Sequence, residues 1–433
     1  MRSIALPAAF TLVFKTATVN VAVMVANALG MIVCARVLGA ESRGVLAAWM
    51  IWPPVLSAML AIGMNSSFIY FSKHDASSYA RYTSALIVAA GLMSVAGACL
   101  MWEAASFFYR LQIERAPALR SWLAAFAFAM TLFSLLSGIS QTTHNLSLYN
   151  ATRLVPPAIY LIFSVSLSFF LKLDTLDFLV IYVGGYLVAG AVLAYSALSE
   201  LRTRFSFDFQ TLKKLAVHGL KFWCLDVMAV LSAQVDKMFL VAFLAPRVVG
   251  IYAVAYGLSR ILTQLQLAIA TVIFPRTAGK NLHLVSEQVS LAFRISSVGS
   301  VLLGLCAVAI GKYAIVFMYG HQYAEAAPIF AILIVESIVS GGGWILSQTF
   351  NAVGRTELIV MRQIASLIVT CLVMYLLTPI WHAEGVAVSL LAGSLTRFFM
   401  TVNAYSIFLK IASPRLFLNV QDLNYLLSRF KEK

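Results

Sequence analysis

The sequence predicts an all-α polytopic membrane protein, with about 12 transmembrane helices in two six-helix lobes around a central cavity. Three observations predict this class. Hydrophobic residues make up 61% of the 433 residues and charged residues only 11%, with a mean hydropathy of +0.89, whereas soluble domains carry about 25% charged residues. The apolar residues are gathered into runs long enough to cross a bilayer. An internal repeat also divides the chain nearly in half.

Each predicted helix is an apolar run of about 20 residues, the length that spans the hydrocarbon layer. In chain order the runs lie near residues 16–38, 44–71, 82–102, 121–141, 154–171, 178–199, 216–243, 248–274, 289–311, 326–350, 357–379 and 385–409. Pro53-Pro54, Pro156-Pro157 and Gly341-Gly342-Gly343 fall within these runs and predict bending points of the kind that rocking transporters use. The alternative is that these residues are simply common in transmembrane helices.

The internal repeat consists of two pairs of short segments at nearly the same offset. Ser140-Gln141-Thr142 recurs 207 residues later as Ser347-Gln348-Thr349, and Gly44-Val45-Leu46-Ala47 resembles Gly250-Ile251-Tyr252-Ala253, 206 residues later. Because each half holds an even number of spans, the two repeats share one orientation, and an axis along the membrane normal would relate them.

The repeat and the charges set the expected domain boundaries. We expect a first lobe over residues 1–200, a cytoplasmic linker over 201–215, a second lobe over 216–410 and a cytoplasmic interfacial tail over 411–433. Lys and Arg concentrate in the loops on the side of the N-terminus, so the positive-inside rule predicts both termini in the cytoplasm. The tail alternates apolar and basic residues, a pattern typical of a helix on an anionic membrane surface.

Ionisable residues inside the spans are the candidate functional residues, because each costs about 2.5–3.5 kcal/mol to insert unless it faces a partner or a wet cavity. We expect Arg260, Arg397, Lys15 and Lys237 to bind an anionic headgroup, with Gln264 one turn beyond Arg260 on the same face. The acids Asp226, Glu336 and Asp236 are the candidates for binding a coupling proton or Na⁺. A purely structural Asp236–Lys237 pair is an equally good interpretation of those two residues.

Several other functions find no support in the sequence. The net charge of +14 does not indicate nucleic-acid binding, because the basic residues lie between apolar runs. Five cysteines without paired spacing and scattered histidines predict no disulfide framework and no metal site. The sequence also lacks a Walker-type loop, so we expect no bound cofactor and no direct use of ATP.

Two motifs resemble those of a known family. The junction Cys34-Ala35-Arg36-Val37-Leu38-Gly39-Ala40-Glu41-Ser42-Arg43-Gly44 is similar to that of Wzx-type flippases of lipid-linked oligosaccharides. Asp236-Lys237, the segment from Val249 to Tyr256, and Phe274-Pro275-Arg276 are similar to the same family's second half. The family belongs to the multidrug/oligosaccharidyl-lipid/polysaccharide exporter superfamily, and the resemblance implies its MATE-like fold.

The resemblance implies a function as well. A Wzx-type flippase carries the undecaprenyl-diphosphate-linked repeat unit of an O-antigen, capsule or exopolysaccharide from the cytoplasmic to the outer leaflet of the bacterial inner membrane. The resemblance also implies a cationic cavity and coupling to an ion gradient of H⁺ or Na⁺. The partners that it implies are membrane lipids, a polysaccharide polymerase and a chain-length regulator.

Two other classes of function remain open. An ion-coupled multidrug or metabolite exporter of the same superfamily would need an acidic cavity for its cationic substrates. A membrane-embedded polysaccharide polymerase or glycosyltransferase would need a large outer loop with acid and base residues, and the longest predicted outer loop, from Glu103 to Arg120, contains only Glu103 and Glu114 as acids.

Overall fold

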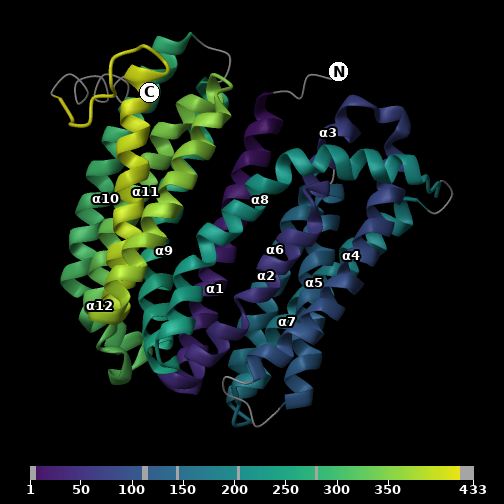
Figure 1. Ribbon diagram of the computed structural model, residues 1–433, viewed down its shortest axis with the longest axis horizontal. Helices are drawn as coiled ribbons and strands as arrows, with labels where there is room; N and C mark the ends of the chain where they lie inside the picture. The colour runs from purple at the N-terminus through teal and green to yellow at the C-terminus, as the bar shows by residue number, and fades with distance from the viewer. Residues whose placement is uncertain (1–5, 110–115, 143–145, 202–204, 278–280, 420–433) are drawn as a thin grey trace. The chain divides into compact units, whose positions relative to one another are not determined.

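The computed structural model describes residues 6–109, 116–142, 146–201, 205–277 and 281–419, and within these residues all regular structure is helical (Figure 1). In chain order the long helices are α1 (Leu6–Trp49), α2 (Trp52–Ala61), α3 (Met64–His74), α4 (Tyr79–Tyr109), α5 (Ala116–Thr142), α6 (Leu146–Ser168), α7 (Thr175–Glu200), α8 (Phe209–Phe243), α9 (Pro246–Thr277), α10 (Leu282–Tyr319), α11 (Ala326–Ala352) and α12 (Thr356–Ile407). This confirms the predicted all-α class.

The chain divides into two compact units, Met1–Met238 and Phe239–Lys433. Packing therefore assigns most of α8 to the first unit, whereas the predicted lobes divide at the linker over 201–215. Trp223 on α8 shows why: its Nε1 donates a hydrogen bond to the Met59 carbonyl at 2.9 Å. Each unit also has its own apolar core, built around Phe126 and Phe178 in the first and around Phe350 and Tyr405 in the second.

The helices of the described residues are long and apolar enough for the predicted number of membrane crossings. Nine helical segments in the described residues are long and apolar enough to cross, and the bent α8 makes a tenth. Two of these segments, Thr18–Ala61 and α12, have 44 and 52 residues, which as straight helices would extend about 66 and 78 Å, more than twice the hydrocarbon thickness of about 30 Å. Each contains a non-helical residue, Gly39 and His382 respectively, and is long enough for two crossings.

The two halves of α12 form an antiparallel hairpin. The backbone of His382 leaves the helical region (φ 48°, ψ −125°). On either side of it, Ser366 Oγ donates to the Gly393 carbonyl at 2.8 Å, and Arg362 Nη1 donates to Thr401 Oγ1 at 3.0 Å. Contacts that pair residues at increasing distance from the break require two helices running in opposite directions, which matches the predicted spans 357–379 and 385–409.

The three predicted bending points lie at one helix start and inside two continuous helices. Pro53-Pro54 begins α2 directly after a break in the helix, where proline is well tolerated. Pro156-Pro157 lies inside α6, which continues on both sides of it. Gly341-Gly342-Gly343 likewise lies inside a helix without a break, α11. There the missing side chains allow close packing: a Cβ at Gly341 would collide with Gln266 of α9, and one at Gly342 would lie 2.8 Å from the Phe293 ring of α10.

The predicted interfacial tail is described only in part. Residues 411–419 contain no helix, and residues 420–433 lie outside the described residues.

Candidate functional site

A cluster of opposite charges lies inside the second unit, where α9, α11 and α12 meet. Glu336 of α11 is only 2% exposed and lies between two arginines. Its Oε2 accepts a hydrogen bond from Arg260 Nη2 of α9 at 2.8 Å, and its Oε1 is 3.9 Å from Arg397 Nη2 of α12. We call these three residues the charge cluster. The sequence predicts that both arginines bind an anionic headgroup. It predicts a different role, the binding of a coupling ion, for the acid that they share.

Polar neighbours fix the geometry of the charge cluster. Ser394 Oγ donates to Glu336 Oε1 at 2.6 Å and accepts from Arg397 Nη2 at 2.8 Å. Arg397 also donates to Ser340 Oγ at 3.3 Å and to Gln363 Oε1 at 3.4 Å. The guanidinium of Arg260 lies over the Tyr256 ring, 4.3 Å from its centroid, a cation–π geometry. The arginines are therefore held in place from several helices.

The charge cluster carries an excess of positive charge. Two guanidiniums face one carboxylate, so one positive charge is not balanced within it. The carboxylate is enclosed, whereas the side chains of Arg260 and Arg397 are 24% and 25% exposed. Each guanidinium has five N–H donors in a planar fork, a shape suited to phosphate and carboxylate oxygens. This arrangement favours an anionic ligand.

A third arginine, Arg362, is buried near the charge cluster on α12. It is 4% exposed and donates to the Gly343 carbonyl at 3.2 Å and to Thr401 Oγ1 at 3.0 Å. Sequence reasoning did not select Arg362 as a candidate functional residue. Its place inside the predicted span 357–379 was the signal that could have identified it.

The remaining predicted site residues have separate environments. Gln264 is exposed on α9, one turn beyond Arg260. On α8, in the first unit, Asp236 is 1% exposed, Asp226 is exposed, and Lys237 Nζ donates to Gln234 Oε1 at 2.8 Å. Lys15 lies in α1, but its side chain is outside the described residues. Among the described residues, no group of three or more His, Cys, Asp or Glu could hold a metal ion.

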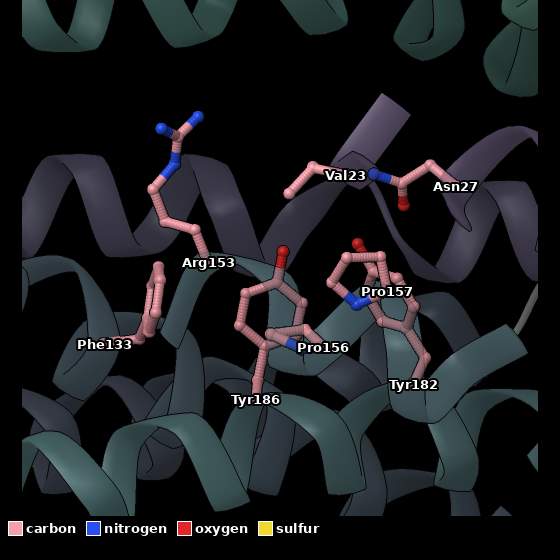
Figure 2. A pocket seen from close by; sticks show the side chains of 8 residues that line it. All are labelled: Val23, Asn27, Phe133, Arg153, Pro156, Pro157, Tyr182 and Tyr186. Carbon is pink, nitrogen blue, oxygen red and sulfur yellow. The ribbon is translucent and has the colours of Figure 1, made fainter. Parts of the chain in front are cut away.

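The first unit contains a pocket of about 170 Å³ (Figure 2). Helices α1, α5, α6 and α7 supply its lining: Val23, Asn27, Phe133, Arg153, Pro156, Pro157, Tyr182 and Tyr186. Gly185 allows α6 and α7 to approach here, because a Cβ on it would lie 2.8 Å from the Pro156 Cα. Sequence reasoning did not find this pocket, since its residues are brought together only by tertiary packing.

Comparisons with known proteins identify both the family and the fold. The sequence matches the model of a family described as polysaccharide biosynthesis protein over residues 12–279, more than half of the chain. A comparison with curated proteins finds no match.

Solved structures share the whole architecture. An inward-facing MATE-family multidrug resistance transporter of the MOP superfamily matches with a TM-score of 0.73 at 14% identity, over 90% of this chain and 96% of that chain. The lipid II flippase MurJ, in an inward closed conformation, matches with a TM-score of 0.75 at 14% identity, over 96% of this chain and 92% of that chain. A MATE transporter of Vibrio cholerae matches with a TM-score of 0.60 at 15% identity, over 92% and 98%.

At these identities the structural likeness shows the fold, which is the predicted MATE-like one, and the sequence match shows the family. The chain is a multi-span membrane protein that belongs to the polysaccharide biosynthesis protein family.

Proposed function

We propose that this protein is a flippase that moves a diphosphate-linked oligosaccharide lipid, of the undecaprenyl type, from the cytoplasmic to the outer leaflet by alternating access. The observation that carries the proposal is the charge cluster, in which two partly exposed arginines share one enclosed acid. The family match and the likeness to a lipid II flippase support the same class of substrate.

The substrate's chemistry explains why such a cluster is needed. A diphosphate-sugar headgroup must cross about 30 Å of hydrocarbon, and burying its charge without partners would be prohibitive. Arg260 and Arg397 can offer paired N–H donors to phosphate oxygens, and the lipid tail can remain in the bilayer while the headgroup crosses. In this mechanism the arginines replace the water that the diphosphate leaves behind.

In this proposal the charge cluster has two states, one with Glu336 ionised and one with Glu336 protonated. While the carboxylate is ionised it competes with phosphate for the guanidiniums, because it accepts from Arg260 directly and approaches Arg397. A proton on Glu336 would remove that competition and release both arginines. Proton binding at Glu336 and diphosphate binding would then favour each other, which is a route for coupling to an ion gradient.

An exporter of cationic drugs fits the charge cluster poorly. Such a substrate requires an acidic surface, whereas the only acid of the cluster is 2% exposed and lies against two guanidiniums. Desolvating a cation beside the excess positive charge would be unfavourable.

Substitution of the arginines in cells tests the proposed substrate. We expect surface polysaccharide to decrease in the order Arg, Lys, Ala, Glu at position 260 and at position 397, in a host that depends on this protein. Lysine keeps the charge but loses the bidentate fork, and glutamate repels the diphosphate. The matched control is Arg247→Ala, because Arg247 also pairs with a glutamate, Glu325 at 3.0 Å, but both are exposed. Unchanged polysaccharide in the Glu variants at normal expression would contradict the proposal.

A further inference from the structure

The pocket in the first unit has the composition of a carbohydrate-binding site. Its volume of about 170 Å³ is below the roughly 300–1,000 Å³ of pockets for drug-sized ligands, and it is close to the size of one sugar ring. None of its eight lining residues is acidic, and Arg153 is the only charged one. A cationic ligand is therefore disfavoured, and a neutral or anionic one is favoured.

Three aromatic rings from two helices form one wall of the pocket. The rings of Tyr182 and Tyr186, one turn apart on α7, have centroids 5.2 Å apart, and Phe133 of α5 meets Tyr186 edge to face at 5.6 Å. These contacts hold the rings in fixed orientations. Figure 2 shows both tyrosine hydroxyls directed to the same side of the pocket as Arg153 and Asn27. An aromatic wall with a polar rim matches a pyranose, which has an apolar C–H face and an edge of hydroxyl groups.

Polar groups at the rim can meet those hydroxyls. Arg153 Nη1 donates to Asn20 Oδ1 at 2.9 Å, which leaves other donors of its five-donor guanidinium available. The exposed amide of Asn27 supplies both a donor and an acceptor. Pro156 and Pro157 have no N–H, so the helix cannot supply its usual donor to the carbonyls of Thr152 and Arg153 one turn earlier. The pocket thus combines donors and acceptors beside an aromatic face.

We propose that this pocket binds one sugar residue of the transported glycan, with its ring against Tyr186 and its hydroxyls at Arg153 and Asn27. The inference extends the proposed function to a second site, and its test does not depend on the charge cluster. Sugar recognition in the first unit would add selectivity for the glycan to the recognition of the diphosphate, which every lipid-linked oligosaccharide of this type shares.

Saturation-transfer NMR on the full-length protein in lipid nanodiscs tests the proposal without lipid or diphosphate. The probes are four methyl glycosides, those of glucose, galactose, N-acetylglucosamine and glucuronic acid. We expect the wild type to saturate the ring protons of at least one of them. Tyr186→Ala should abolish that signal, and Tyr186→Phe, which keeps the ring and removes one hydroxyl, should weaken affinity about three- to tenfold.

Matched variants separate binding from folding. Tyr195→Ala removes a 77% exposed tyrosine from the same helix and should leave glycoside binding unchanged. Asn27→Ala alters an exposed side chain of the pocket, so it should weaken binding without unfolding the protein. If no probe binds the wild type, or if Tyr186→Ala and Asn27→Ala bind like the wild type, the proposal is wrong.

The outcome is also distinguishable from failure of the proposed function. Arg260→Ala should reduce transport and leave glycoside binding intact. If only the sugar-binding proposal is wrong, transport will depend on Arg260 and no glycoside will bind. If only the proposed function is wrong, glycoside binding will depend on Tyr186 and substitution of Arg260 will leave transport unchanged.

Discussion

At the scale of single residues, the sequence identifies the members of the charge cluster but not their pairing. Arg260, Glu336 and Arg397 stand out because charge is rare inside apolar runs. Arg260 and Glu336 are 76 residues apart in the chain, and no local pattern reports a contact over that separation. The sequence therefore predicts separate roles for the arginines and the acid, whereas the fold places them in direct contact.

Neutralising the shared acid should strengthen anion binding. In Glu336→Gln both guanidiniums lose their carboxylate competitor, so inorganic pyrophosphate should bind the purified protein about tenfold more tightly, as expected for one charge-assisted hydrogen bond gained. Isothermal titration calorimetry measures this affinity. The control is Glu325→Gln, which neutralises the exposed partner of Arg247 and should change nothing. Equal or weaker pyrophosphate binding in Glu336→Gln would show that the arginines are not available to an anion.

At the scale of elements, the apolar runs locate the long helices, whereas packing decides the role of the glycines within them. The break of α12 at His382 lies in the gap between the predicted spans 357–379 and 385–409. The triple glycine of α11 has the composition of a flexible joint, yet its function depends on what packs against it. Sequence alone does not show that Gln266 and Phe293 occupy the space that side chains at Gly341 and Gly342 would need.

The close packing at α11 predicts that two Gly→Ala substitutions change the stability of the protein in opposite directions. Gly341→Ala should destabilise the protein by about 1–3 kcal/mol, the typical cost of overpacking, because the new methyl group collides with Gln266. Gly299→Ala on α10 has no heavy atom within 4 Å of the new Cβ, and should be neutral or stabilising by up to about 1 kcal/mol through helix propensity. Thermal unfolding in detergent compares the two. Equal changes in thermal stability would mean that Gly341 is not required for the close packing of α11.

The start of α8 should be sensitive to acid. Asp208 precedes the helix: it accepts from the Thr211 hydroxyl at 2.7 Å and from the N–H groups of Gln210 and Thr211 at 3.0 and 3.1 Å. These bonds, that of the Thr211 hydroxyl foremost, hold the pKa of Asp208 below its usual value. A lowered pKa means stabilisation that is present above the unfolded-state pKa and is lost as pH falls through the folded-state pKa.

Hydrogen exchange at residues 209–214 measures that dependence. After correction for intrinsic rates, wild-type protection should fall below about pH 4, the region in which an aspartate titrates. Asp208→Ala should show the loss already at neutral pH and no further change on acidification. Protection in Asp208→Ala that equals the wild type at neutral pH would show that Asp208 does not cap α8 in solution.

At the scale of the whole molecule, the internal repeat is consistent with the observed helices. Ser140-Gln141-Thr142 ends α5 and Ser347-Gln348-Thr349 lies near the end of α11, while Gly44 and Gly250 lie near the start of the second and the eighth crossing. Each pair is therefore six crossings apart. The repeat and the long apolar helices were predictable because both depend on local composition. The pocket in the first unit was not predictable, because it depends on four helices that meet only in the folded protein.

The orientation of the molecule in the membrane is a separate prediction. Lys and Arg concentrate on the side of the N-terminus, so the segment between α7 and α8 should face the cytoplasm. A cysteine introduced at the exposed Ser206, in a variant without the five native cysteines, should resist membrane-impermeant thiol reagents in intact cells and react after permeabilisation. Labelling from outside would reverse the topology and the proposed direction of transport.

The measurement that tests the central claim most directly is transport of a fluorescent undecaprenyl-diphosphate oligosaccharide between the leaflets of liposomes that contain the purified protein. Protein with Arg260→Lys should transfer the lipid more slowly than the wild type, Arg260→Ala more slowly still, and Arg260→Glu slowest, while Arg247→Ala transfers it at the wild-type rate. This order follows from an arginine that contacts a negative headgroup. Transfer by Arg260→Glu as fast as by Arg260→Ala, with both proteins folded, would contradict the claim that the charge cluster binds the diphosphate.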